Sequence, residues 1–178
     1  MQVQLTDDWV LRSLRADDGG ALAAYFAALS PESKRRFQPH PLTATVAEEL
    51  CAAASSTALR LVIDRTGKII GYFIFETVMS VHEATRYRPF GHALETGKDF
   101  LFAPSMADAF QNQGLASRAM PHLLGLARQS GARSVVLMGG TQATNARAIA
   151  FYEKFGFQRF GGYQTEIYNH DMRLELVV

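Results

Sequence analysis

The chain has 178 residues, of which 48% are hydrophobic, and its 18 basic and 17 acidic residues leave a net charge of +1. This length suits one globular domain with a sizeable core, and we expect a single domain over residues 1–178. The near-zero net charge argues against a nucleic-acid-binding protein. No stretch approaches the roughly 18 consecutive apolar residues of a membrane span.

The class of protein is narrowed further by the cysteine, the histidines and the first residues of the chain. The single cysteine, Cys51, excludes a disulfide framework and a thiolate cluster, and we expect a buried structural thiol. The five histidines lack metal-ligand spacing, so we predict no metal site. The start of the chain carries Asp7 and Asp8 where a signal peptide needs basic and apolar residues. We therefore expect a cytoplasmic protein that binds neither membrane nor nucleic acid.

The sequence of the amino-terminal third of the chain predicts one strand and two helices. Alternating apolar residues predict a strand over Val3–Leu14. Asp17 or Asp18 is placed to cap a helix, which ends at Ser30–Pro31 because proline disfavours the helical conformation of the residue before it. A polar loop or short helical turn follows, and a capping-box pattern then predicts a second helix over Thr45–Ala54.

The middle of the chain predicts a hairpin, a long connection and a central strand. The β-rich runs Ala58–Asp64 and Lys68–Val78 are separated by the turn Arg65–Gly67. The segment Met79–Lys98 has no clean period and is longer than an ordinary connection, so we interpret it as a functional lid. Asp99–Ala107 then predicts a strand.

The remaining elements complete an α+β fold. A helix runs to Ser130, with a kink expected at Pro121, and Gly131 is placed to terminate it. The later elements are a buried strand over Ser134–Met138, a helix capped by Asn145 and ended by Gly156, and strands over Phe157–Gly162 and about Glu166–Val177. This order predicts a central, mostly antiparallel mixed sheet of about seven strands, flanked by about four helices.

The turn Gln111–Gly114 between the central strand and its helix has the chemistry of an anion site. The first N–H groups of a helix have no intrahelical partners, and the helix dipole adds partial positive charge there. The small residues Gly114, Ala116 and Ser117 would let a pyrophosphate reach the backbone.

A second motif lies on the helix that follows Asn145. Tyr152 comes seven residues later, so both side chains emerge on one helix face. Gln111-x-x-Gly114-x-Ala116 together with the Asn145–Phe157 stretch resembles the GNAT superfamily of acyl-CoA-dependent N-acetyltransferases. The resemblance is dense from residue 99 to about residue 162 and weaker over the rest of the chain.

The resemblance implies an N-acetyltransferase that moves an acetyl group from acetyl-CoA to a primary amine of a small molecule or protein, by direct attack in a ternary complex. It implies a GNAT-like sheet splayed between the fourth and fifth strands, Asp99–Ala107 and Ser134–Met138. Pro104 suits such a splay because it cannot donate to a ladder. The implied cofactor-binding residues are Met106, Ala107, Gln111, Asn112, Gln113, Gly114, Leu115, Ala116, Ser117, Asn145, Ala148 and Tyr152.

Tyr152 is the implied donor to the leaving thiolate. A tyrosine with an ordinary pKa near 10 has little drive to protonate a thiolate whose conjugate acid lies near 8.5, so a positioned hydrogen bond serves as well as full transfer. The structural alternative is a core aromatic, since Phe151 and Phe155 flank it. Asn145 likewise has two readings, cofactor contact and a plain helix cap.

The general base is left open by the sequence. At neutral pH a lysine-like amine is almost wholly protonated, a deficit of roughly 4 kcal/mol that a base would lower. The candidates are Glu76, Asp99 and Asp108, with His82 and His92 as further alternatives. Residues in such positions are more often solvated surface charges or strand-end caps.

Several alternatives stay open at this level. Arg35, Arg36 and His40 would line the acceptor site or meet the adenosine 3′-phosphate, although most such basic runs are simply solvated. A non-catalytic acyl-CoA-binding module, a different acyl donor and a homodimer are compatible with the same motifs. The sequence does not identify the acceptor.

Overall fold

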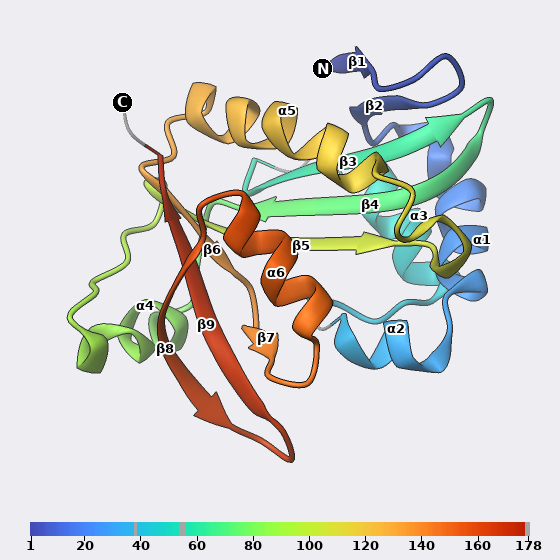
Figure 1. Cartoon of the computed structure of the whole chain (residues 1–178). Coiled ribbons are helices and arrows are strands. Elements are labelled where there is room, and N and C mark those ends of the chain that lie inside the picture. Colours follow the sequence, from blue (N-terminus) through green and yellow to red (C-terminus); the bar gives the residue numbers. More distant parts are fainter. Residues whose placement is uncertain (38, 54–55, 177–178) are drawn as a thin grey trace. The chain divides into compact units, whose positions relative to one another are not determined.

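The computed structural model describes residues 1–37, 39–53 and 56–176. These residues form an α+β fold with a large mixed sheet and flanking helices (Figure 1). The elements are β1 Gln2–Gln4, β2 Val10–Ser13, η1 Ala16–Asp18, α1 Gly19–Ala28, α2 Pro31–Arg36, α3 Ala44–Ala52, β3 Ala58–Arg65, β4 Lys68–Glu76, α4 Val81–Arg86, η2 Arg88–Phe90, β5 Asp99–Met106, η3 Asp108–Phe110, α5 Leu115–Gln129, β6 Ser134–Leu137, β7 Thr141–Gln142, α6 Ala146–Lys154, β8 Gln158–Gln164 and β9 Tyr168–Glu175. None of the helices in the described part of the chain is long and apolar enough to span a membrane.

The strand order is β1-β2-β3-β4-β5-β6-β9-β7, with β8 paired to β9. The β5–β6 pair is parallel, whereas β1–β2, β2–β3, β6–β9, β7–β9 and β8–β9 are antiparallel. The predicted α+β class and mixed sheet are therefore confirmed, with nine strands in the described residues rather than seven. The β5–β6 register ends at the pair Phe102↔Leu137, although β5 continues to Met106.

Two differences explain the additional strands. The predicted strand Val3–Leu14 is a hairpin of β1 and β2, because the Leu5 N–H donates to the Trp9 carbonyl (2.9 Å) and reverses the chain. The loop after β6 contains the two-residue strand β7, which pairs with β9.

The helices also differ from the prediction in number and in two caps. Asp18 precedes α1, but its side chain makes no capping hydrogen bond to that helix and pairs with Arg12 instead. The polar segment after Ser30 forms α2, with Ser30 as its cap and Pro31 in the first turn. The cap of α3 is Thr43, whose hydroxyl accepts from the Val46 N–H, so α3 begins one residue before the predicted start. The predicted end of this helix at Ala54, like the predicted strand end at Val177, falls outside the described residues.

The predicted lid segment is not an irregular loop. A capping box of Ser80 and Glu83 starts α4, and η2 follows it. Tyr87 is 1% exposed and packs in a cluster that includes Leu101 and Val136. Because these buried contacts fix much of the segment, it is part of a core, and a role as a lid stays a prediction.

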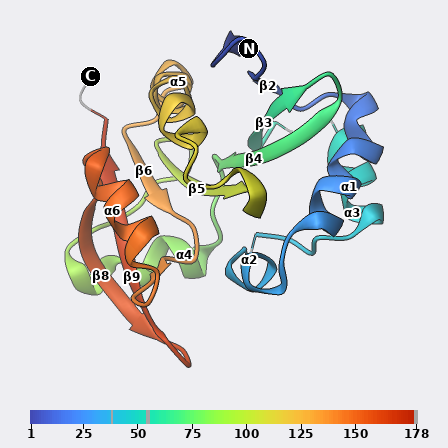
Figure 2. The same ribbon diagram turned by 45° about the vertical axis from the view of Figure 1, so that its right-hand side comes forward.

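The chain divides into two compact units, Met1–Ile74 with Ala103–His122 and Phe75–Phe102 with Leu123–Val178. Strands β4 and β5 and helix α5 each contain residues of both units. In the first unit, α1 and α3 lie side by side (Figures 1 and 2), and Leu22 and Phe26 of α1 are fully buried. Arg12 and Asp18 form a buried ion pair there (2.6 Å).

In the second unit, β6 is buried along its whole length and β9 pairs with it. Successive residues of β9 point to opposite faces of the sheet. Arg173 accordingly contacts His92 of the segment before β5, whereas Leu174 approaches Gly156 at the end of α6. The segment of His92 and helix α6 therefore cover opposite faces of β9.

Candidate active site

In the first unit, the predicted anion-binding turn lies between η3 and α5. Asn112 and Gly114 have left-handed backbone conformations, with φ of 63° and 77°. The Gly114 carbonyl accepts from the Arg118 N–H (3.0 Å), so Gly114 immediately precedes the helical hydrogen bonds of α5. The N–H groups of Leu115, Ala116 and Ser117 are then the first of α5 and have no intrahelical acceptor.

The turn leaves room above its backbone. A Cβ placed on Gly114 would meet no atom within 4 Å, and Asn112 and Gln113 are exposed. Free helical N–H groups, the helix dipole and open space over a glycine are what a pyrophosphate needs. The residues of the turn therefore fit the pyrophosphate of acetyl-CoA.

The two glutamines of the turn brace its backbone. The Gln111 side chain donates to the Met106 carbonyl (3.1 Å), and the Gln113 side chain donates to the Ala109 carbonyl (2.8 Å). Ala107 extends the β4–β5 pairing by donating its N–H to the Ile70 carbonyl (2.8 Å). Both carboxamide groups therefore hold the turn, and the backbone N–H groups at the start of α5 are the donors that it leaves for an anion.

In the second unit, α6 carries the second motif. The Asn145 side chain accepts from the Ala148 N–H (3.2 Å), so its predicted role as a helix cap is confirmed. Tyr152 is buried, and its ring packs on Phe151 and Phe157 with centroid distances of 5.3 and 5.5 Å. The Tyr152 hydroxyl has no hydrogen-bond partner among the described residues. Burial raises the pKa of Tyr152, so the hydroxyl keeps its proton.

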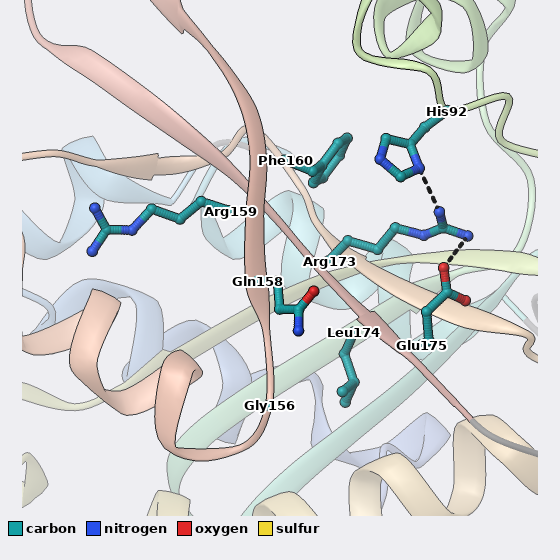
Figure 3. A pocket seen from close by; sticks show the side chains of 8 residues that line it. All are labelled: His92, Gly156, Gln158, Arg159, Phe160, Arg173, Leu174 and Glu175. Atoms are coloured by element: carbon teal, nitrogen blue, oxygen red, sulfur yellow. Dashed lines mark hydrogen bonds and ion pairs between the residues drawn. The ribbon is translucent and has the colours of Figure 1, made fainter.

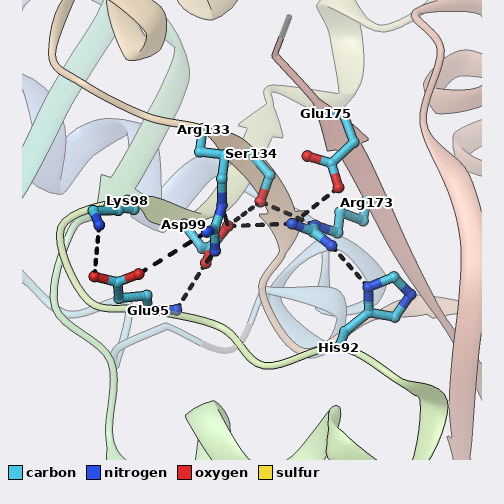
Figure 4. Close-up of polar contacts among 8 residues, drawn as sticks. All are labelled: His92, Glu95, Lys98, Asp99, Arg133, Ser134, Arg173 and Glu175. Atoms are coloured by element: carbon cyan, nitrogen blue, oxygen red, sulfur yellow. Dashed lines mark hydrogen bonds and ion pairs between the residues drawn. The ribbon is translucent and has the colours of Figure 1, made fainter.

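Asp99, a candidate base, is fully buried at the start of β5 (Figure 4). It accepts from the Ser134 hydroxyl (2.6 Å), Arg133 (2.5 Å) and the Glu95 N–H (2.7 Å), and Arg173 lies 3.3 Å away. Burial by itself raises the pKa of Asp99, but these donors outweigh it and hold the pKa below its usual value. Such a carboxylate is a weak base.

Asp108 and Glu76 lie in different surroundings. The Asp108 carboxylate accepts from the N–H and hydroxyl of Ser30 and from the hydroxyl of Ser33 (2.7–2.9 Å), which fastens the start of α2. These donors outweigh the effect of burial and lower the pKa of Asp108. Glu76 is the half-buried last residue of β4.

A cavity of about 480 Å³ lies in the second unit (Figure 3). It is lined by His92, Gly156, Gln158, Arg159, Phe160, Arg173, Leu174 and Glu175. Glu175 pairs with Ser134 at the first residue of β6. Leu137, the residue of β6 that pairs with Phe102 of β5, lies at the opposite end of β6. The cavity contains none of the predicted cofactor-binding residues, and His92 is the one candidate base that lines it. His82 lies on α4 and is exposed.

An ion pair in the second unit was not predicted from the sequence. Asp171 of β9 is fully buried and binds Arg86, whose guanidinium lies 4.6 Å from the ring centroids of Tyr87 and Tyr163. Burial raises the pKa of Asp171, and Arg86 only partly opposes this. An acidic residue within the predicted strand Glu166–Val177 was the available signal, but alternation alone does not distinguish the buried face when both faces are covered.

Comparison with known proteins decides the family. The model of the acetyltransferase (GNAT) family matches residues 22–157. The chain belongs to the GNAT acetyltransferase family. Among proteins of curated function, none matches the sequence.

Solved structures of other acetyltransferases share the fold. The GNAT domain of PAT from S. lividans is 18% identical, with a TM-score of 0.74 and coverage of 94% of this chain and 90% of that chain. The ribosomal-protein-S5-alanine acetyltransferase from Vibrio fischeri is 12% identical, with a TM-score of 0.75 and coverage of 98% and 96%. The ribosomal-protein-S18-alanine N-acetyltransferase from Escherichia coli is 20% identical, with a TM-score of 0.64 and coverage of 96% and 95%. At these identities the likeness concerns the fold, and this GNAT chain is an acetyltransferase by its family.

Proposed function

We propose that this GNAT acetyltransferase moves an acetyl group from acetyl-CoA to a primary amine, by direct attack of the amine in a ternary complex. The observation that carries the proposal is the turn before α5, where Gly114 has a left-handed conformation and open space above it. Acetyl-CoA supplies an acetyl group activated as a thioester. No metal is part of the proposal, and we place the reaction in the cytoplasm.

The residues of the two motifs have different roles in this proposal. The N–H groups of Leu115, Ala116 and Ser117 bind the pyrophosphate, and the strand end at Met106 and Ala107 together with the turn residues Gln111, Asn112, Gln113 and Gly114 forms the adjoining surface. Asn145 and Ala148 contact the cofactor from the start of α6. Tyr152 holds a proton on its hydroxyl and donates a hydrogen bond to the thiolate as it leaves.

The three carboxylates that are candidate bases, Asp99, Asp108 and Glu76, have different roles in this proposal. Asp99 and Asp108 are held by several donors with lowered pKa values, so we assign them to the fold and not to proton transfer. Glu76 keeps its place as a candidate base.

Two of the solved structures named above support a proposal for the class of acceptor. Both enzymes act on an alanine of a ribosomal protein, as their names state. We propose an amine acceptor of the same chemical class, a primary amine of a protein or of a small molecule.

A thiol-release assay tests the proposed function. The purified full chain is incubated with acetyl-CoA and, in separate reactions, a peptide with a free amino-terminal alanine, a lysine-containing peptide with a blocked amino terminus, and a polyamine. We expect amine-dependent release of free CoA thiol and a mass increase of one acetyl group on an acceptor. Tight binding of acetyl-CoA without transfer to any amine would instead favour a non-catalytic acyl-CoA-binding protein.

A further inference from the structure

His40 of the first unit is held in one tautomer. Its Nδ1 lies 2.9 Å from the Pro41 carbonyl oxygen, which can only accept a hydrogen bond. Nδ1 therefore carries a hydrogen. In the neutral ring the lone pair is then on Nε2, which lies 3.3 Å from the Tyr72 hydroxyl.

The surroundings of His40 keep its ring neutral. The ring lies 5.2–5.8 Å, centroid to centroid, from the rings of Phe26, Phe37 and Tyr72. Burial lowers the pKa of His40, the Pro41 carbonyl opposes this, and the charge of Arg60 on β3 lowers the pKa further. Among the described residues, Arg60 acts on the ring through its charge, and the ionisable side chain of Tyr72 lies against it. At neutral pH, His40 thus carries a lone pair on Nε2, and its side chain is partly exposed.

The lone pair of His40 faces the part of the sheet that the proposed reaction uses. Tyr72 lies on β4, which runs opposite to β5 (Figure 1) and pairs with it through the Ala107–Ile70 hydrogen bond. Ser105 of β5 in turn bonds the hydroxyl of Tyr25 (2.7 Å). These residues lie along the carboxyl half of β5, beyond the last β6 pair at Phe102 and directly before the pyrophosphate turn.

We propose that His40 is the general base that takes the proton from the acceptor amine. This inference rests on the proposed function. The N–H bond of the acceptor ammonium breaks, an N–H bond forms at His40 Nε2, and the positive charge moves to the imidazole while the neutral amine keeps its electron pair for attack. The Pro41 carbonyl orients the ring in both charge states.

The contact with Tyr72 accommodates both forms of the ring. A tyrosine hydroxyl can donate to the lone pair of neutral His40 or accept from the N–H of the charged ring. Tyr72 is therefore a positioning residue for His40. Its 3.3 Å contact with Nε2 is long for a hydrogen bond, so the hydroxyl competes only weakly for the lone pair.

Asp99, Asp108 and His92 are less suited to this step than His40. Asp99 and Asp108 are each occupied by several donors. The Nδ1 of His92 accepts from Arg173 (2.8 Å), because arginine has no acceptor atom. His40 combines partial exposure, a fixed tautomer and a lone pair that faces Tyr72 of β4, the strand next to β5.

Nuclear magnetic resonance of the ¹⁵N-labelled full chain tests the tautomer without any acceptor. We expect the His40 signals at pH 7.5 to show a protonated Nδ1 and an unprotonated Nε2. The Tyr72→Phe variant should leave Nδ1 protonated, because the Pro41 carbonyl still accepts. A protonated Nε2 with a bare Nδ1 would overturn the proposal.

Kinetics test the role in proton transfer. With whichever amine of the thiol-release panel reacts fastest, His40→Gln should lower kcat/KM about 10²-fold at pH 7. The deficit should shrink as the pH rises toward the pKa of the amine, because solvent then supplies the neutral amine. His122→Gln, on the exposed face of α5, is the matched control and should keep the rate of the original chain.

The outcomes of this experiment separate the two proposals. A deficit that is constant from pH 7 to 10, or a normal rate in His40→Gln, would show that His40 is structural, while the proposed function stands. Absence of transfer to every amine by the unaltered chain would contradict the proposed function itself. Acetyl-CoA affinity should be unchanged in His40→Gln, since the residue acts on the acceptor.

Discussion

Tyr152, the proposed donor to the leaving thiolate, shows how the environment of a side chain limits its chemistry. Its ring lies against Phe157, and burial raises the pKa of its hydroxyl above the usual value. A CoA thiol has a pKa near that of cysteine, about 8.5, so proton transfer from Tyr152 to the thiolate is uphill by more than about 2 kcal/mol. Donation of a hydrogen bond to the developing thiolate carries no such cost, and we expect it to be the contribution of Tyr152.

The Tyr152→Phe variant tests this role. The aromatic ring and its packing are kept, so we expect unchanged folding and an acetyl-CoA affinity within about threefold of the original. Loss of one donor to developing charge should lower kcat by about 10- to 100-fold, or roughly 1.4–2.7 kcal/mol. Steady-state thiol release measures kcat, and calorimetry measures affinity. Tyr168→Phe, at a side chain that is 42% exposed, is the control, and equal rates in both variants would remove Tyr152 from the mechanism.

Gly114 permits a sharper test of the pyrophosphate turn. Alanine at this position would meet no atom within 4 Å, so its cost to stability, about 1 kcal/mol, comes from the left-handed backbone alone. The added methyl group would stand where we expect the pyrophosphate, and the dissociation constant of acetyl-CoA should rise at least tenfold.

Gly67→Ala is the matched control for Gly114→Ala. Gly67 lies in the β3–β4 turn of the same unit, with φ of 85° and no atom near the added Cβ. It should show the same loss of stability in denaturant titration and an unchanged affinity for acetyl-CoA. Equal affinities in the two variants would place the cofactor away from this turn.

At the scale of elements, Asp99 joins three strands of the second unit. It lies at the start of β5 and contacts Ser134 of β6 and Arg173 of β9 (Figure 4). Arg173 in turn holds His92 on the segment before β5. One buried carboxylate therefore fastens the amino ends of the parallel pair to their antiparallel neighbour and to the long connection.

The Asp99→Asn variant should change the acid stability of the protein. The pKa of Asp99 is lowered in the folded state, so its contribution to stability is present above the unfolded pKa of about 3.9 and is lost as the pH falls through the folded value. The variant leaves buried donors without their charge partner and should cost about 3–5 kcal/mol at pH 7. Its stability should fall less steeply below pH 4, as measured by denaturant unfolding at several pH values.

Glu95→Gln is the control for the change in stability at acid pH. Glu95 is in the same network, but its side chain is 54% exposed, so its ion pairs contribute at most about 1 kcal/mol. An acid dependence of Asp99→Asn equal to that of the original chain would show that Asp99 is not ionised in the folded protein.

At the scale of the whole molecule, the two compact units share three elements. β4, β5 and α5 each begin in one unit and end in the other, so neither unit can lose its strands or helix without disturbing the other. We expect one cooperative unfolding transition, in line with the single domain predicted for residues 1–178.

Two probes measure this cooperativity. Trp9, the single tryptophan, packs on Phe110 in the first unit, so its fluorescence reports that unit. Hydrogen exchange of the β6 and β9 amide groups reports the second unit. Coincident midpoints in urea are expected, whereas two separated midpoints would show that the units unfold independently.

The sequence by itself determined the elements whose signals are local. The turn before α5 and the α6 motif could be located because glycine, small residues and helix caps act within a few residues along the chain. Gly131 and Gly156 end their helices as predicted, with φ of 92° and 88°. The family resemblance rested on these local patterns.

Tertiary structure decided the features that depend on partners distant in the sequence. Asp99 and Asp108 are candidate bases by residue type and position, but in the fold Arg133 lies against Asp99 and Ser30 against Asp108. A carboxylate becomes a base or an anchor according to such neighbours. The tautomer of His40 likewise depends on its contacts in the fold. The type of a residue and its spacing in the sequence indicate which reactions its side chain is capable of. Its burial and its contacts in the fold determine which of these reactions it can still perform.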